Sequence, residues 1–210
     1  MKSLIEHNPE VMIYVFAEDD ELPFKIPCRH RIINISQQTY FPKDGPNMHN
    51  WFTYCAMMRA CAADLIPEDR VISLDVDTII CDSLQPIWEM DLTDKWLGWC
   101  PEYKGWHKPF GKTYYNFGVS VLNLAQMRKD GVVAKAVEIL NTEECTYLEQ
   151  DVFNRIAVPD KCADIPVRFN ESFCCGETDD PAIVHYAGYA DWFVNMRRMP
   201  RRDYLLKYMT

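Results

Sequence analysis

Short runs of apolar, largely β-branched residues recur along this 210-residue chain, and segments with apolar residues at helical spacing lie between them. The predicted strands are 11–16, 30–36, 70–80, 96–100, 114–124 and 182–188, and the predicted helices are 1–7, 49–66, 132–140 and a short one from 149. Strands that are apolar on both faces are typical of a sheet covered by helices on both sides. The alternation therefore predicts an α/β fold.

The length suits a single domain over residues 1–210, with a basic and aromatic tail at 190–210. A net charge of -9 argues against a surface that binds nucleic acid. The chain opens without a secretory signal, and we see no apolar run of about 18 residues that would span a membrane. The nine cysteines show no Cys-x-x-Cys spacing, so we expect free thiols in a cytoplasmic protein.

Two aspartates, Asp75 and Asp77, interrupt the predicted strand 70–80. Alternate residues of a strand share one face, so we expect the two carboxylates to point together. Adjacent carboxylates repel each other unless a cation lies between them, and Mn²⁺ or Mg²⁺ suits oxygen ligands. An Asp-x-Asp arises easily by chance, but this one ends an apolar strand, where α/β sheets bind their ligands.

Other polar residues have ordinary structural explanations when each is taken alone. His185 can be a satisfied core histidine, Gln150 and Asp151 a helix cap, and Asn116 a turn residue. Arg59 can lie on the surface of its helix.

Five motifs in order nevertheless give the chain a resemblance that no single motif would carry. "TYCAMMRA", "VISLDVDTII", "YYNFGVSVLNL", "LEQDVFN" and "IVHYAG" together resemble glycosyltransferase family 8 over about residues 2–192. The resemblance implies the GT-A fold, a mixed Rossmann-like sheet flanked by helices. It also implies retaining transfer of a hexose from a UDP-sugar, with Mn²⁺ or Mg²⁺ as cofactor.

The resemblance also implies roles for particular residues. Asp75, Asp77 and His185 match the metal ligands, and Asp75 also matches a donor contact. The remaining donor-binding positions are Arg59, Asn116, Gly118 and Gly188.

At the sugar's reacting carbon, Glu149 and Gln150 stand where the family usually has Asp-Gln. We interpret Gln150 as a positioning or charge-stabilising group, because an amide is a poor nucleophile. Glu149 or Asp151 as a covalent nucleophile is the less favoured alternative.

The chain departs from the family pattern at three places. Phe117 replaces the small residue usual after the motif's asparagine, and Ala190 and Asp191 stand near where a phosphate-binding lysine is common. The chain also begins on a helix, where the family begins with a strand. We therefore expect the family's first strand to be lacking, either because the 210 residues are a shortened version of a longer reading frame or because another segment or chain fills the gap. We also expect weak UDP binding and self-association through the exposed sheet edge.

Two other function classes stay open at the sequence level. One is a non-catalytic nucleotide-sugar-binding domain, and the other is a metal-dependent phosphohydrolase or nucleotidyltransferase, which also uses paired carboxylates. The acceptor, a sugar, glycan or protein, is not named by the sequence. The basic tail has two interpretations, weak contact with an anionic membrane or a final helix docked on the core.

Overall fold

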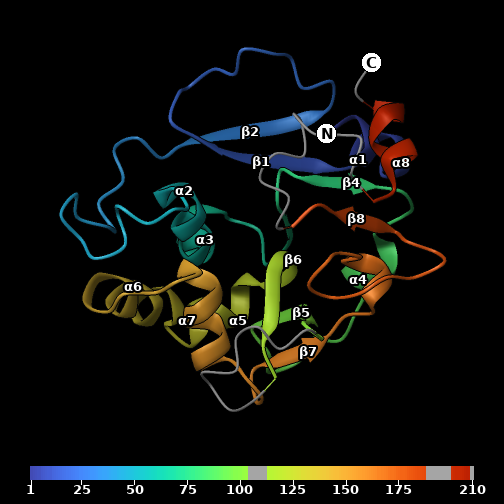
Figure 1. Cartoon of the computed structure of the whole chain (residues 1–210). Helices are drawn as coiled ribbons and strands as arrows, with labels where there is room; N and C mark the ends of the chain where they lie inside the picture. The colour runs from blue at the N-terminus through green and yellow to red at the C-terminus, as the bar shows by residue number, and fades with distance from the viewer. Residues whose placement is uncertain (104–112, 188–199, 209–210) are drawn as a thin grey trace.

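The computed structural model describes residues 1–103, 113–187 and 200–208 (Figure 1). Its central sheet has four strands in the order β3-β6-β5-β7. These strands are β3 (Arg70–Leu74), β5 (Leu97–Pro101), β6 (Tyr115–Asn123) and β7 (Cys162–Asp164). β6 runs antiparallel to β3 and β5, and β7 runs parallel to β5, so the predicted mixed α/β sheet is confirmed.

Helices cover this sheet on both faces, as the apolar strands predicted. One core gathers Trp99, Phe117 and Phe153 with the helices on the left of Figure 1. Those helices are α2 (Tyr54–Met57), the 3-10 turn η1 (Met58–Cys61), α3 (Ala62–Leu65), α5 (Leu124–Lys129), α6 (Val132–Thr142) and α7 (Leu148–Ile156). A second core packs Val119 and Val121 against α4 (Gln85–Trp88) and the 3-10 turn η3 (Val167–Phe169).

The predicted single strand over 70–80 is wrong. The chain leaves β3 after Leu74 and re-enters a strand at β4 (Thr78–Ile80), which pairs antiparallel with β8 (Ile183–His185) in a separate sheet. The two aspartates therefore lie in the turn between strands, where Val76 is 97% exposed. The sequence looked like one strand because β3 and β4 both carry apolar side chains that pack against the core.

The helix predicted over 49–66 is shorter than expected. It begins at Tyr54 and passes through η1, which tightens the backbone where Arg59 lies. The predicted helices at the N-terminus and at 132–140 are confirmed as α1 (Lys2–His7) and α6.

A further pair of strands, β1 (Met12–Ala17) and β2 (Arg29–Asn34), runs parallel above the central sheet in Figure 1. Among the described residues β1 pairs with β2 alone, and β3 pairs with β6 alone. β1 and β3 thus each keep one edge without a strand partner in this part of the chain.

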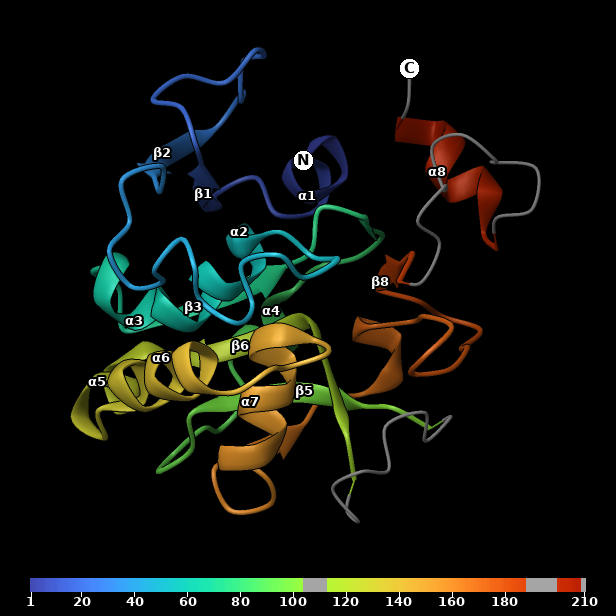
Figure 2. The same ribbon diagram turned by 60° about the vertical axis from the view of Figure 1, so that its left-hand side comes forward.

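The C-terminal helix α8 (Arg202–Tyr208) lies beside α1 and β8, as Figures 1 and 2 show. Leu205 is 1% exposed and packs with Ile79, Val184 and Tyr186, as the docked interpretation expects, whereas Leu206 is 39% exposed. Within the described ranges no helix is both long enough and apolar enough to cross a bilayer.

Candidate functional site

Three side chains that could ligate a metal meet beside the end of β3. Asp75 follows β3, Asp77 precedes β4, and His185 is the last residue of β8. The Nε2 atom of His185 lies 3.5 Å from Asp75 Oδ2 and 3.4 Å from Asp77 Oδ1. One ligand atom from each residue lies within 4.8 Å of the other two. The structure thus brings together the three residues that the resemblance assigned to a metal.

The backbone around these residues fixes the turn. The Asp75 N–H donates to Gly118 O at 2.7 Å, and the Thr78 hydroxyl donates to Asp75 O at 2.7 Å. The Tyr186 N–H donates to Asp77 O at 3.0 Å. Each aspartate is therefore tied to a neighbouring strand before any ligand binds.

Gly118 leaves the space in which these side chains sit. A Cβ atom added there would lie 2.1 Å from His185 Cε1 and 2.7 Å from Asp75 Oδ2. No carbon atom fits at those distances, so any larger residue must displace a ligand side chain. The sequence assigned Gly118 to donor binding, and the structure places it against His185 and Asp75.

The charges of the three side chains favour a cation between them. Burial lowers the pKa of His185, but the hydrogen bonds and charges of Asp75 and Asp77 outweigh it and raise the pKa to about 10. Burial alone would raise the pKa of Asp75, yet the positive charge of Arg59 and the hydrogen bond to His185 hold it well below its usual range. The imidazolium thus supplies positive charge that a metal would replace.

These residues fit a divalent metal ion. Two carboxylate oxygens and one imidazole nitrogen form a ligand set that Mn²⁺ accepts, and carboxylates also suit Mg²⁺. Three protein ligands leave further coordination positions for oxygens of another molecule. The space at Gly118 and the converging ligand atoms are what the fit rests on.

Arg59 links this cluster to a second polar group. Its guanidinium donates from Nη1 to Asp75 Oδ1 and from Nη2 to Glu149 Oε1. The same guanidinium lies over the ring of Phe117, 5.1 Å from the centroid, in a cation–π contact. Phe117, which departs from the family motif, thus packs against the guanidinium of Arg59.

Glu149 is 1% exposed at the start of α7. Burial raises the pKa of its carboxyl group to about 7, although Arg59 opposes the shift. Within the described part of the chain, Glu149 Oε2 and Arg59 Nε are buried without a hydrogen-bond partner. Buried polar atoms are normally satisfied, so these two are candidates for contact with a ligand.

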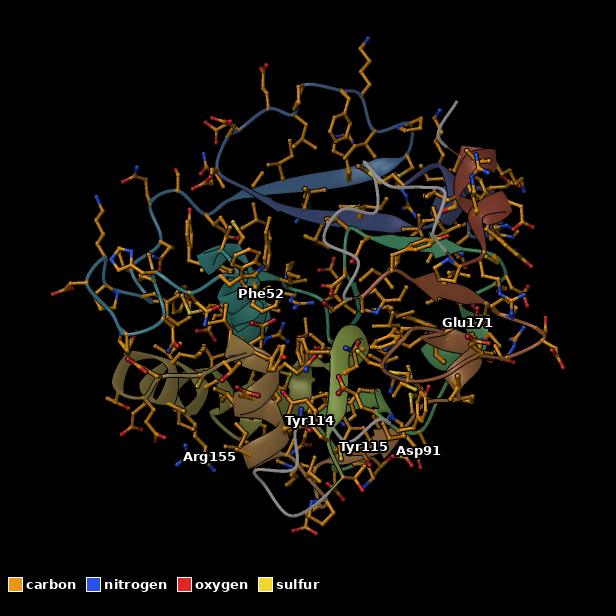
Figure 3. The ribbon with its side chains drawn as sticks, in the orientation of Figure 1. Phe52, Asp91, Tyr114, Tyr115, Arg155 and Glu171 are labelled. Carbon is orange, nitrogen blue, oxygen red and sulfur yellow. The ribbon has the colours of Figure 1, made fainter. Side chains whose placement is uncertain are left out.

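Gln150 and Asp151 are held by the protein itself. Gln150 Oε1 accepts from the Phe117 N–H at 2.8 Å, and its Nε2 donates to Tyr114 Oη at 3.1 Å. Asp151 accepts from the Tyr114 hydroxyl at 2.5 Å with one oxygen and from the Tyr147 N–H at 2.9 Å with the other. Figure 3 labels Tyr114 between α7 and the start of β6.

Asn116 lies on β6 and is 7% exposed. Its side chain bonds to Glu102, to Asn170 and to the Gly118 N–H. Sequence reasoning missed Glu102 and Asn170, which stand in no recognisable motif. It gave no role to Tyr114, although Tyr114 opens the motif "YYNFGVSVLNL". Gly188, Ala190, Asp191 and Trp192 lie outside the described residues.

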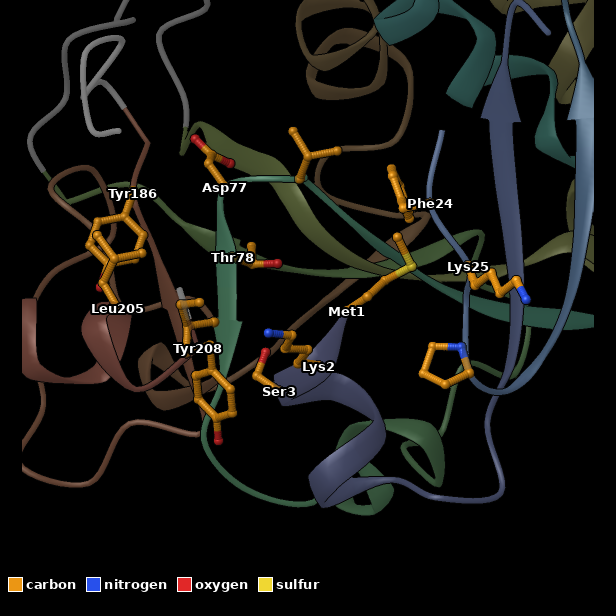
Figure 4. Close-up of a pocket in the computed structure, with 13 residues that line it drawn as sticks. Met1, Lys2, Ser3, Phe24, Lys25, Asp77, Thr78, Tyr186, Leu205 and Tyr208 are labelled. Carbon is orange, nitrogen blue, oxygen red and sulfur yellow. The ribbon is translucent and has the colours of Figure 1, made fainter. Parts of the chain in front are cut away.

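A pocket of about 450 Å³ opens beside Asp77. Figure 4 shows Asp77 and Thr78 on one side of it and Met1 and Phe24 on the other. Phe24 is 53% exposed, which leaves an apolar wall next to the cluster of Asp75, Asp77 and His185.

Comparison with known proteins places the chain in a family. The family model described as glycosyl transferase family 8 matches residues 1–192. The sequence is 25% identical to the glycosyltransferase GlyA of Streptococcus pneumoniae, over 90% of this chain and 29% of GlyA. It is 26% identical to the lipopolysaccharide glucosyltransferase WaaO of Escherichia coli, over 70% of this chain and 52% of WaaO. The chain therefore spans about a third to a half of the length of such relatives.

Solved structures show the same fold. The galactosyltransferase LgtC, in complex with donor and acceptor sugar analogues, superposes with a TM-score of 0.62 at 22% identity, covering 78% of this chain and 67% of LgtC. An active-site mutant of LgtC superposes with a TM-score of 0.71 at 20% identity, covering 98% and 88%. The chain therefore belongs to glycosyltransferase family 8, and its fold is the GT-A fold that the sequence resemblance implied.

Proposed function

We propose that this chain transfers a hexose from a UDP-sugar to a sugar acceptor with retention, assisted by Mn²⁺ or Mg²⁺. The observation that carries the proposal is the direct link between two sites through Arg59. This side chain bonds to Asp75 of the metal-ligating cluster and to the buried Glu149. A donor whose diphosphate lies at the cluster would have its sugar within reach of Glu149.

Asp75, Asp77 and His185 would hold the ion, which as a Lewis acid neutralises charge developing on the UDP leaving group. The pocket beside Asp77 supplies apolar surface at Met1, Phe24 and Val76 that suits a nucleoside. The exposed Lys25 also lines this pocket and adds a positive charge to it.

The sugar would lie against Arg59, Asn116 and Glu149. Glu149 Oε2 and Arg59 Nε have no hydrogen-bond partner among the described residues. Glu149 Oε2 would accept a hydroxyl hydrogen, and Arg59 Nε would donate to a hydroxyl oxygen. A ligand that satisfies both atoms removes the cost of burying them unpaired. Hydroxyl groups of a hexose offer both kinds of partner.

Gln150 acts as a positioning group in this proposal. Its amide oxygen already accepts the Phe117 N–H, so attack by that oxygen on the anomeric carbon would break a buried backbone hydrogen bond. Both oxygens of Asp151 are also engaged. We therefore favour attack by the acceptor from the leaving-group face over a covalent intermediate on Glu149 or Asp151.

A non-catalytic nucleotide-sugar-binding domain is the second candidate. It is favoured by the strand edges of β1 and β3, which have no partner on one side within the described residues. A metal-dependent phosphohydrolase or nucleotidyltransferase is less favoured, because the described cluster holds two carboxylates and one histidine without a further carboxylate.

The experiment is a UDP-release screen over common UDP-sugars with Mn²⁺ and simple sugar acceptors, followed by nuclear magnetic resonance of the product's anomeric centre. We expect acceptor-dependent UDP release with one donor and retained configuration. Donor binding without release would favour the binding-domain alternative, and inverted product would refute the retaining mechanism.

A cytoplasmic location and the absence of nucleic-acid binding remain predictions from composition. Self-association through the edges of β1 and β3 that have no strand partner in the described part of the chain is a further prediction. Light scattering over a concentration series tests it, and a monomer at all concentrations would contradict it.

A further inference from the structure

A backbone hydrogen bond fixes the orientation of the Asn116 side chain. The Gly118 N–H donates to Asn116 Oδ1 at 3.0 Å. A backbone N–H can only donate, so the atom of the amide that faces it must be the oxygen. This assignment needs no knowledge of hydrogen positions on the side chain.

The orientation passes from Asn116 to Asn170 and then to His185. The oxygen of Asn116 also faces Asn170 at 3.0 Å, so Asn170 must present its Nδ2 donor there. Its oxygen then faces His185 Nδ1 at 2.8 Å and can only accept. The Nδ1 atom of His185 must therefore carry the hydrogen.

The consequence falls on the other ring nitrogen. In a neutral imidazole with its hydrogen on Nδ1, the lone pair is on Nε2. Nε2 is the atom that faces Asp75 and Asp77 at 3.5 and 3.4 Å. Once the imidazolium gives up its Nε2 hydrogen to an incoming ion, the chain of amides thus presents the lone pair to the position between the two carboxylates.

Asn170 is held in place for this task. It is fully buried, and its neighbour Glu171 bonds to β8 through its N–H to Ile183 O at 3.0 Å. The His185 N–H returns a bond to Glu171 O at 2.8 Å. Figure 3 places Glu171 beside β8. Asn170 and His185 therefore cannot separate without breaking this backbone pairing.

We propose that Asn170 is a positioning residue that fixes His185 in the tautomer with hydrogen on Nδ1 and so sets up the metal site. This inference rests on the proposed metal-assisted function. Partners that orient a ligating histidine commonly change metal affinity 10- to 100-fold when removed. Asn116 belongs to the same network, so the metal ligand and the donor-side amide share one fixed arrangement.

The tautomer can be observed directly in the unaltered protein. Long-range ¹H–¹⁵N correlation spectra of ¹⁵N-histidine-labelled protein, loaded with diamagnetic Mg²⁺, report which ring nitrogen carries the hydrogen. A His185→Ala spectrum assigns the signal among the five histidines. We expect hydrogen on Nδ1 of His185 and none on Nε2, and hydrogen on Nε2 with none on Nδ1 would overturn the proposal.

Variants test whether Asn170 is responsible. Asn170→Leu should weaken Mn²⁺ binding, measured by calorimetry, by about 10- to 100-fold. Asn170→Asp keeps an oxygen acceptor for His185 Nδ1 and should bind Mn²⁺ more tightly than Asn170→Leu. Equal affinity of Asn170→Leu and the unaltered protein would overturn the proposal, as would equal losses in both variants.

Asn47→Leu is the matched control. Asn47 is 2% exposed and bonds to backbone atoms of Leu140, Glu143 and Cys145, far from His185 in the fold. The Asn47→Leu variant should be less stable than the unaltered protein but should bind Mn²⁺ with the same affinity. If the unaltered protein binds no divalent ion at all, the proposed metal-assisted function is wrong. If it binds the ion but Asn170→Leu binds equally well, only the role proposed for Asn170 is wrong. If Asn170→Leu does not fold, the tautomer spectrum and Asn170→Asp still decide.

Discussion

Gly118 lies so close to His185 that a single added carbon atom would come within 2.1 Å of the imidazole ring. Gly118 has no side chain of its own, yet it limits where the side chains of His185 and Asp75 can lie. The same backbone segment also carries Asn116 and Phe117, which contact Asn170 and Arg59. This strand is therefore the support on which the site is built.

Gly118→Ala should weaken Mn²⁺ binding by about 10-fold or more, because the methyl group must push aside His185 or Asp75. Calorimetric titration with Mn²⁺ measures it. Ser120→Ala, two residues along the same strand, removes a buried hydroxyl that has no partner in the described chain and should bind Mn²⁺ normally. Full affinity in Gly118→Ala would show that the ligands do not need this space.

Metal affinity should rise as the pH increases from about 7 towards 10. In the metal-free protein His185 has a pKa of about 10, so an incoming ion must displace its proton. Calorimetry in two buffers of different ionisation enthalpy measures the protons released. We expect close to one proton per ion at pH 7, and no release would contradict the involvement of His185.

Glu149 should make the metal-free protein less stable as the pH rises. Its folded pKa of about 7 exceeds the unfolded value, so between about pH 4.5 and 7 the folded state binds more protons than the unfolded state. The free energy of unfolding then falls with rising pH across this window. Urea unfolding of Glu149→Gln should show a smaller decrease, and an unchanged pH dependence would argue against the raised pKa.

Arg59→Ala and Gln150→Ala should affect different kinetic constants. Arg59→Ala should mainly raise KM for the donor, since a guanidinium pairs with donor oxygens and orders Asp75. Gln150→Ala should mainly lower kcat, as expected of a group acting near the transition state. Steady-state kinetics separate the two, and identical effects would refute the division of roles.

Arg59→Ala also leaves Glu149 buried without its cationic partner. Removing one member of a buried pair costs about 3–5 kcal/mol. Arg59→Ala/Glu149→Gln tests this stability cost, because the second change removes the uncompensated carboxylate charge. Thermal unfolding of both variants should show that the double change recovers part of the lost stability.

Much of the fold could be predicted from local pattern. The strand β6 and the helix α6 could be predicted without tertiary information, because the spacing of their apolar side chains already indicates which positions are buried. The break between β3 and β4 could not be seen, since an apolar run does not reveal which strand it pairs with. It depends on β6 and β8, which follow much later in the chain.

The site was predicted in part for a related reason. Asp75, Asp77 and His185 stood in motifs, and the structure brings them together. Asn170 and Glu102 stand in no motif, and their importance comes from hydrogen bonds to Asn116 across the fold. Such partners follow from tertiary contacts, which spacing along the sequence does not encode.

The central claim is that Asp75, Asp77 and His185 hold the ion used in sugar transfer. The most direct measurement is the rate of UDP release from the preferred donor in EDTA and after excess Mn²⁺ is restored, with Asp75→Ala and Asp77→Ala beside the unaltered protein. The account predicts loss of release in EDTA, recovery with Mn²⁺ in the unaltered protein, and no recovery in either variant. Full release in EDTA, or in either variant, would contradict it.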